Sequence, residues 1–165
     1  MDWQDVRVMI TGAGGFIGSH LVEALACQGC RVRAFVHYNS RGDPGLLKQL
    51  PAHLFSKIEI IAGDLRDPQF TEKAVSGCEV VFHLGAHISI PYSYLHPYEV
   101  VQTNIIGTLN ILMACKNEKV SKVIHTSSSE VYGTAQTVPI SEKHPLQGQS
   151  PYSASKIGSD KLAES

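Results

Sequence analysis

The sequence lacks the features that mark membrane proteins and nucleic-acid-binding proteins. Its formal net charge is -1, its lysines and arginines are scattered, and it has no apolar run long enough to cross a bilayer. The N-terminal stretch carries acids and leads directly into an apolar segment, so we expect no signal peptide and a cytoplasmic location. We expect no nucleic-acid or membrane partner, because the balanced charge suits a small nucleotide-like ligand better.

Cysteine is also scarce, with four residues in a chain of 165. The only close pair, Cys27 and Cys30, falls where a helix is expected to end, and no second ligand pair accompanies it. We therefore predict reduced structural thiols and no metal site. With 43% apolar residues the chain can bury one core, which favours a single domain.

The apolar residues alternate between short strand-like runs and helical patterns. We expect strands at residues 6–10, 32–36, 58–62, 80–84 and 123–126, and helices after the first strand, near residues 68–76, across 97–116 and from Pro151 onward. Strands that are apolar on both faces and alternate with helices predict an α/β fold with a doubly wound parallel sheet. The stretch 42–51 lacks periodicity and is expected to be a surface excursion.

A glycine-rich turn follows the first expected strand. Gly12, Gly15 and Gly18 are spaced so that one permits a tight turn, one lets backbone N–H groups approach a pyrophosphate, and one permits close contact between helix and strand. The turn therefore predicts a dinucleotide-binding site.

Four segments together resemble a known family. TGAGGFIG at residues 11–18 resembles the T-G-x-x-G-F-I-G signature of extended short-chain dehydrogenases/reductases, and GDLRD at 63–67, HLGA at 83–86 and NIIGTLN at 104–110 resemble later motifs in the same order. The resemblance implies an NAD(P)-dependent nucleotide-sugar epimerase or dehydratase with a Rossmann fold. The cofactor-binding residues that it implies are Gly12, Gly15, Phe16, Ile17, Gly18, Asp64, Leu65, Leu84, Gly85, Ala86 and Asn104, together with Tyr152 and Lys156.

The resemblance also bears on domain organisation. No sixth strand follows the last expected helix, although a sheet of this kind normally continues. We expect residues 1–165 to be the NAD(P)-binding Rossmann domain of a longer enzyme, truncated before the C-terminal sugar-binding part. The resemblance also implies a homodimer, formed through the helix at 97–116 and the terminal helix. The alternative is that the apolar residues of these helices pack against the sheet as ordinary core.

The end of the second expected strand has no carboxylate to bind the ribose 2′-hydroxyl of NAD. No acid occurs between Glu23 and Asp43, and His37, Ser40 and Arg41 stand there instead. Hydroxyls and cations suit a 2′-phosphate, so these three residues favour NADP over NAD as the cofactor. The alternative is that Arg41 is an ordinary solvated charge in a loop.

Tyr152 and Lys156 form the only tyrosine-lysine pair at a spacing of four, which places both side chains on one face of a helix. An ammonium beside a phenol favours the phenolate, which can accept a proton from an alcohol while hydride leaves. In the family pattern a serine after the fifth strand completes the catalytic set, and here that residue is Ser128.

Glu130 narrows the predicted reaction. Epimerases that resemble this chain carry a small neutral residue at that position, whereas nucleotide-sugar 4,6-dehydratases carry Glu as the base that removes the proton at C5. The preceding residue is Ser129, where dehydratases of deoxythymidine sugars have Asp, so the resemblance is to the GDP-mannose dehydratase type. Some sugar-acid decarboxylases share the Ser-Glu pair, and a Glu that merely caps a surface turn is a further alternative.

The segments at residues 38–40 and 86–93 most resemble 4,6-dehydratases of the legionaminic-acid pathway type, which act on UDP- or GDP-N-acetylglucosamine. We expect Ser89, Ser93, Ser128 and Ser129 to contact the nucleotide-sugar substrate. Three alternatives remain at this stage: a 4-epimerase, a decarboxylase, or a dinucleotide-binding module without activity.

Overall fold

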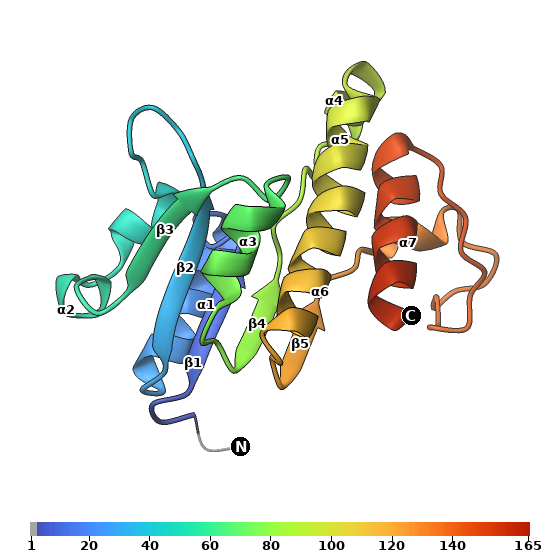
Figure 1. Cartoon of the computed structure of the whole chain (residues 1–165). Helices are drawn as coiled ribbons and strands as arrows, with labels where there is room; N and C mark the ends of the chain where they lie inside the picture. The colour runs from blue at the N-terminus through green and yellow to red at the C-terminus, as the bar shows by residue number, and fades with distance from the viewer. Residues whose placement is uncertain (1–2) are drawn as a thin grey trace.

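The computed structural model describes residues 3–165 and contains one parallel β-sheet with helices on both faces (Figure 1). The strand order is β3-β2-β1-β4-β5, and every neighbouring pair is parallel. The strands are β1 (Arg7–Thr11), β2 (Arg31–His37), β3 (Glu59–Gly63), β4 (Val80–His83) and β5 (Lys122–His125). The chain thus crosses from β3 back past β1 to β4, which makes the sheet doubly wound and confirms the predicted fold class.

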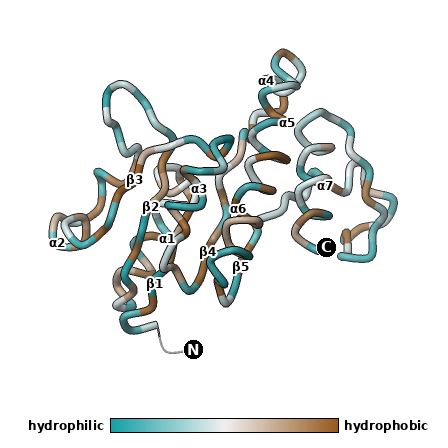
Figure 2. The backbone as a smooth tube through the Cα atoms, viewed as in Figure 1, coloured by the Kyte–Doolittle hydropathy of each residue, from teal (hydrophilic) through white to brown (hydrophobic). Residues whose placement is uncertain are grey.

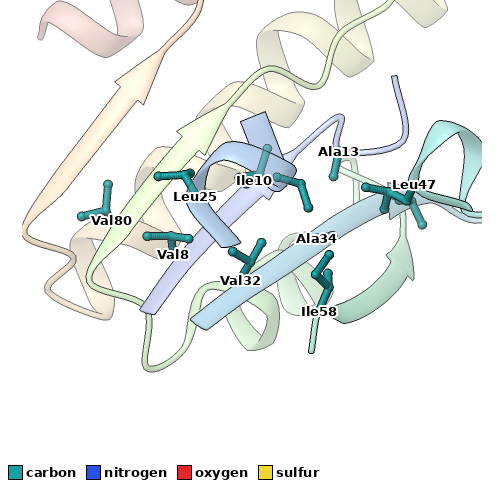
Figure 3. Close-up of a cluster of buried hydrophobic side chains, with 11 residues drawn as sticks. Val8, Ile10, Ala13, Leu25, Val32, Ala34, Leu47, Ile58 and Val80 are labelled. Atoms are coloured by element: carbon teal, nitrogen blue, oxygen red, sulfur yellow. The ribbon is translucent and has the colours of Figure 1, made fainter. Parts of the chain in front are cut away.

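Alternate residues along the strands are buried in two separate hydrophobic cores, one on each face of the sheet. On one face Val8, Ile10, Val32 and Ala34 pack beneath α1 (Phe16–Cys27), as Figure 3 shows. The other face is covered by α3 (Pro68–Val75) and α6 (Gly107–Asn117), which bury a second cluster around Met9, Phe35, Val81 and Ile111. Burial on both faces explains why the central strands are almost continuously apolar in sequence.

The long helix expected at 97–116 is interrupted. It consists of α5 (Pro97–Val101), a π-helical segment η2 (Gln102–Ile106) and α6, preceded by the short α4 (Ile90–Leu95). One extra residue in the π turn changes which side chains face inward, and such segments often occur at functional sites.

The terminal helix α7 (Pro151–Glu164) begins as the sequence predicts. Ser150 and Ser153 each accept a hydrogen bond from the other's backbone N–H, which forms a capping box, and Pro151 occupies the first turn. The helix packs against α5, η2 and α6, on the β5 side of the molecule (Figure 1).

The stretch 42–51 differs from the surface excursion expected from its sequence. It forms a 3-10 helix, η1 (Gly45–Gln49), followed by the short α2 (Ala52–Phe55), and Leu47 is fully buried in the α1-side core. Figure 3 shows Leu47 close to Ala13 of the glycine turn. One buried leucine in a short turn produces no periodicity, which is why the sequence pattern did not indicate it.

Within residues 3–165 no helix combines the length and apolar character needed to span a bilayer. All four cysteines are free thiols: Cys78 and Cys115 are buried, Cys30 is half-buried and Cys27 is exposed. Burial raises the pKa of the Cys115 thiol to about 12, so this side chain behaves as a small apolar group.

Leu47→Ala tests whether η1 belongs to the core. Because the leucine is fully buried, we expect the substitution to lower the free energy of unfolding by about 2–5 kcal/mol. Urea denaturation measures the loss, and Leu46→Ala, at a half-buried neighbour, is the matched control. Equal losses for the two variants would contradict the buried position of Leu47.

Candidate active site

A cleft of about 890 Å³ lies at the C-terminal ends of the strands and extends to α7. This is the edge at which open parallel sheets bind ligands. The cleft is lined by thirteen of the residues that the sequence nominated: Gly12, Gly15, Phe16, Ile17, Gly18, His37, Leu84, Ala86, Ser128, Ser129, Glu130, Tyr152 and Lys156. The glycine turn and the proposed catalytic residues therefore share one cavity.

Eight other nominated residues are not among the described residues that line the cleft: Ser40, Arg41, Asp64, Leu65, Gly85, Ser89, Ser93 and Asn104. Ser93 is fully buried and donates a hydrogen bond to the carbonyl oxygen of Ile90, while Ser89 accepts one from the N–H of Tyr92 and caps α4. Both serines thus have local structural partners, whereas Ser40 and Arg41 are exposed in the loop after β2.

The glycine turn has the geometry that a pyrophosphate requires. Gly12 has φ +67, and a side chain there would lie 2.9 Å from the backbone N of Gly85. A Cβ at Gly18 would lie 2.2 Å from the carbonyl oxygen of Gly12, so only glycine lets α1 approach the turn this closely. These are the tight-turn and close-packing roles predicted for the first and third glycines.

The N-terminus of α1 fits the diphosphate of a dinucleotide. Gly15 is the N-cap, no side chain caps the helix, and its first turn has no acidic residue. Phe16 and Ile17 line the cleft, so the positive end of the helix dipole faces the cavity without a competing anion.

A buried hydrogen-bond chain fixes the two strand ends that carry this turn. Thr11 Oγ1 lies 2.7 Å from His83 Nδ1 and accepts hydrogen bonds from the N–H groups of Leu84 and Gly85, at 3.1 and 2.9 Å. His83 Nε2 lies 3.0 Å from Thr108 Oγ1, whose own proton is donated to the carbonyl oxygen of Asn104. The sequence motifs contain these residues, but they do not predict that the side chains are linked by hydrogen bonds.

The hydrogen bonds define the state of His83. Thr108 donates its proton to the carbonyl oxygen of Asn104, so His83 Nε2 must donate to Thr108. Thr11 Oγ1 already accepts two N–H groups, so it donates its own proton to Nδ1. The imidazole is therefore neutral. Complete burial, together with His125 and Lys156, lowers the pKa of His83 to about 3, in agreement with this assignment.

Asn104 links the segment after β4 to the terminal helix through its side-chain amide. Its Oδ1 accepts from the N–H of His87 at 2.8 Å, and its Nδ2 donates to the carbonyl oxygen of His87 and to Ser155 Oγ, at 3.0 and 2.9 Å. Through these bonds η2 holds both the segment after β4 and α7, three residues beyond Tyr152. The π turn thus places a fully bonded amide behind the cleft.

Asp64 and Leu65 also lie behind the cleft rather than in its lining. The Asp64 carboxylate forms an ion pair with Arg66 at 2.5 Å, and hydrogen bonding by that guanidinium lowers the pKa of Asp64. Leu65 packs against Gly85 and Gly107, so it helps to join the segment after β3 to α6.

Lys156 is buried beside the end of β5. Its Nζ donates a hydrogen bond to the carbonyl oxygen of Thr126 at 2.6 Å. Burial lowers its pKa, and the opposing effect of Asp160 is smaller. Asp160, one turn further along α7, accepts hydrogen bonds from Ser127 Oγ at 2.5 Å and pairs with His125 at 3.0 Å. Asp160 and His125 were not predicted from the sequence, although Asp160 lies four residues after Lys156, a spacing that could have indicated it.

Ser128 and Glu130 begin a short 3-10 segment, η3 (Ser129–Tyr132). Ser128 Oγ accepts from the N–H of Glu130 at 3.3 Å, so its own hydroxyl proton remains available to a ligand. Glu130 is exposed and its side chain lines the cleft. The lining of the cavity thus includes residues that carry a phenol, an ammonium, a hydroxyl and a carboxylate.

A doubly wound sheet with this glycine turn, and with a tyrosine-lysine pair in the same cleft, is typical of the extended short-chain dehydrogenases/reductases. The family model described as GDP-mannose 4,6 dehydratase matches residues 9–165, and the chain belongs to this family.

The relatives of this chain include both 4-epimerases and 4,6-dehydratases. The chain is 36% identical to a UDP-glucose 4-epimerase of Mycolicibacterium smegmatis over 94% of its own length and 49% of the relative's. It superimposes with a TM-score of 0.87 on a UDP-N-acetylglucosamine 4-epimerase of Methanobrevibacter ruminantium, at 35% identity and covering 98% of this chain and 50% of that one.

A solved structure of a dehydratase is similar to this chain to about the same degree. The structure of DesIV, a dTDP-glucose 4,6-dehydratase of Streptomyces venezuelae with NAD bound, has a TM-score of 0.86 and 30% identity, covering 96% of this chain and 50% of that one. The chain spans about half the length of the curated relatives that it matches. The preference for NADP expected from His37, Ser40 and Arg41 finds no support in these relatives, and of the three residues only His37 is among the described residues that line the cleft.

The neutral state of His83 predicts how stability depends on pH. Its pKa falls from an ordinary 6.5 to about 3 on folding, so below pH 6.5 the unfolded chain binds a proton that the folded chain does not. Stability is therefore retained above pH 6.5 and lost as the pH falls towards 3. His125, whose pKa burial also lowers, contributes in the same direction.

The variant His83→Gln tests this pH dependence. Between pH 7.5 and 5 the free energy of unfolding should fall by about 2 kcal/mol more in the wild type than in His83→Gln. Urea titrations at both pH values measure this, and equal losses would refute the assignment.

Gly15→Asp tests the uncapped N-terminus of α1. The backbone at this position has φ -79 and ψ 177, which suits an N-cap aspartate, so we expect unchanged or slightly increased stability. The new carboxylate would repel a pyrophosphate, and NADH binding, followed by fluorescence titration, should be lost. Gly15→Ser, an uncharged cap, is the control and should retain more affinity. Undiminished NADH binding by Gly15→Asp would mean that the diphosphate lies elsewhere.

Proposed function

We propose that the whole protein is a nucleotide-sugar 4,6-dehydratase that retains a tightly bound nicotinamide dinucleotide through its catalytic cycle. The observation that carries this proposal is that Glu130 lines the same cleft as Ser128, Tyr152 and Lys156. A cleft that only oxidised and reduced C4 would need the last three residues alone, whereas elimination of water needs a further base.

Three residues act on the C4 hydroxyl in this proposal. Tyr152 accepts the proton of the C4 hydroxyl, Lys156 provides the positive charge that favours the phenolate, and Ser128 donates a hydrogen bond to the oxygen as it becomes a carbonyl. A nicotinamide dinucleotide held in this cleft would supply the hydride acceptor for C4 and the hydride donor for C6. Lys156 is held for this role by its hydrogen bond to Thr126.

Glu130 acts on C5 and C6. The C4 ketone acidifies the C5 proton, which Glu130 removes while the C6 hydroxyl departs. Because the neighbouring position is Ser129 rather than a second acid, the same carboxyl group returns its proton to the leaving hydroxyl, which departs as water. C6 then receives the hydride and C5 receives a proton from solvent, while Tyr152 releases to solvent the proton that it took from the C4 hydroxyl, so the products are a 4-keto-6-deoxy sugar and water.

The proposed substrates are UDP- and GDP-N-acetylglucosamine. They come from the likeness of residues 38–40 and 86–93 to dehydratases of the legionaminic-acid pathway type. Ser128 and Ser129, which line the cleft, are the proposed sugar contacts. Ser89 and Ser93 remain predictions from sequence, because their hydroxyls are bonded locally and lie outside the cleft lining.

A 4-epimerase is the second candidate. It is favoured by the sequence similarity to the Mycolicibacterium epimerase and by the fold similarity to the Methanobrevibacter epimerase. It would use Ser128, Tyr152 and Lys156 in the same way and would not need Glu130. A decarboxylase and an inactive dinucleotide-binding module remain as further outcomes of the same assay.

The proposed oligomer is a homodimer formed through α5, η2, α6 and α7. Support comes from a row of large apolar side chains that are partly or largely exposed along the first three of these elements: Tyr98, Val101, Ile106, Leu109 and Met113. Their spacing of three to five residues places them along one side of the helix. Figure 2 shows hydrophobic bands recurring along this part of the chain.

Glu130→Gln in the full-length protein separates the two candidate reactions. We expect formation of the 4-keto-6-deoxy product from UDP-N-acetylglucosamine to fall by about 10²- to 10⁴-fold, because the amide cannot remove the C5 proton. Product formation is followed by mass spectrometry and by absorbance of the ketone in alkali. Tyr152→Phe is the companion variant and should lose all C4 chemistry. Conversion to the C4 epimer that Glu130→Gln leaves intact would instead establish the epimerase.

A further inference from the structure

A second carboxylate reaches the cofactor cleft from the loop that follows β2. Asp43, Pro44 and Gly45 line the cleft beside His37. The sequence suggested that no acid was available here, because none occurs between Glu23 and the loop. The fold returns the loop to the glycine turn, so that a residue distant from the strand end contributes to the same cavity.

Local hydrogen bonds fix the backbone of Asp43. Asn39 Oδ1 accepts from the N–H groups of Arg41 and Asp43, at 3.2 and 3.0 Å, and Asn39 Nδ2 donates to the carbonyl oxygen of Asp43 at 2.8 Å. The loop is thus closed around one amide side chain, with Asp43 held at its far end.

The far end of the loop is joined to the glycine turn. The N–H of Leu46 donates to the carbonyl oxygen of Gly14 at 2.9 Å, and Leu47 is fully buried in the core. These two contacts keep the loop that carries Asp43 beside the glycine turn, where Asp43 lines the cleft. Arg41 lies on the exposed part of the same loop and is not among the residues that line the cavity.

The Asp43 side chain retains free acceptor capacity. Its Oδ1 accepts from the N–H of Gly45 at 2.9 Å, and its Oδ2 pairs with Lys48 Nζ at 3.0 Å. A hydrogen bond from Lys48 lowers the pKa of Asp43, so the group is ionised at neutral pH. An ionised carboxylate has about four lone-pair positions, and two contacts leave room for a ligand hydroxyl.

We propose that Asp43 selects NAD over NADP by accepting a hydrogen bond from the 2′-hydroxyl of the adenosine ribose and by repelling a 2′-phosphate. Dinucleotide-binding folds usually place such a carboxylate at the end of the second strand. Here that position holds His37 and Tyr38, and the loop supplies the charge instead. The inference rests on the proposed function only in requiring that the cleft bind a dinucleotide.

Binding titrations test the role without reference to activity. Calorimetric titration of the 165-residue chain with NADH and with NADPH should give at least about tenfold tighter binding of NADH, since a hydrogen bond to a charged group has roughly that effect. Asp43→Asn keeps an acceptor for Gly45 and should reduce the preference to about threefold or less. Asp43→Ser, with a shorter side chain, should do the same.

Two controls distinguish the alternatives. Asp5→Asn removes another exposed carboxylate, one that pairs with Arg31 and is not among the described residues that line the cleft, and it should leave the preference unchanged. Arg41→Ala tests the rival residue and should leave NADPH affinity unchanged. Urea denaturation of each variant checks that the loop substitutions have not unfolded the chain.

Three results would overturn the inference. An unchanged NADH to NADPH ratio in correctly folded Asp43→Asn would exclude Asp43 as the selector, while the cleft would remain a dinucleotide site. A wild type that prefers NADPH, with the preference lost in Arg41→Ala, would assign selection to Arg41. Failure of the wild type to bind either dinucleotide would remove the proposed function of the cleft and the role of Asp43 together.

Discussion

The contact between the ends of β1 and β4 is the constraint on which the rest of the site depends. Thr11 is the last residue of β1 and His83 is the last residue of β4. The Thr11 hydroxyl bonds to the His83 imidazole and accepts hydrogen bonds from the N–H groups of the two residues after His83. Gly12 can then lie against the backbone of Gly85 because neither residue has a side chain in the way. The position of the glycine turn, the proposed diphosphate cradle, is set by this contact.

The same contact extends towards Tyr152 and Lys156 through polar groups that are not among the described residues lining the cleft. His83 bonds to Thr108, Thr108 to Asn104, and Asn104 to Ser155 on the helix that carries Tyr152. Every member has its hydrogen-bonding partners, so the chain of bonds is fully satisfied in an interior where an unpaired polar group would be costly. The cradle and the tyrosine-lysine pair are therefore connected by one network rather than by separate loops.

Much of this arrangement could be predicted from the sequence because the signals are local. The apolar strands, the three glycines, and the Ser150, Tyr152 and Lys156 pattern each follow from the periodicity or spacing of neighbouring residues, and the structure contains the fold and brings these site residues into one cleft. Leu47 and the π turn at η2 were not predictable in this way. Each depends on what an isolated segment packs against, which leaves no repeat in its own sequence.

The sequence by itself determined the fold class, the position of the glycine turn and the set of reactive side chains, because backbone conformation and helix spacing follow from residues that are close together in the chain. Only the tertiary structure decided which polar residues face the cavity. The side chains of Asn104, Asp64 and Ser93 form hydrogen bonds or ion pairs within the protein and do not line the cleft. Arg41 is exposed on the surface, whereas Asp43 lines the cleft. The reason is physical: the direction of a polar side chain is set by the nearest partner that can satisfy its hydrogen bonds, and that partner is commonly distant in sequence.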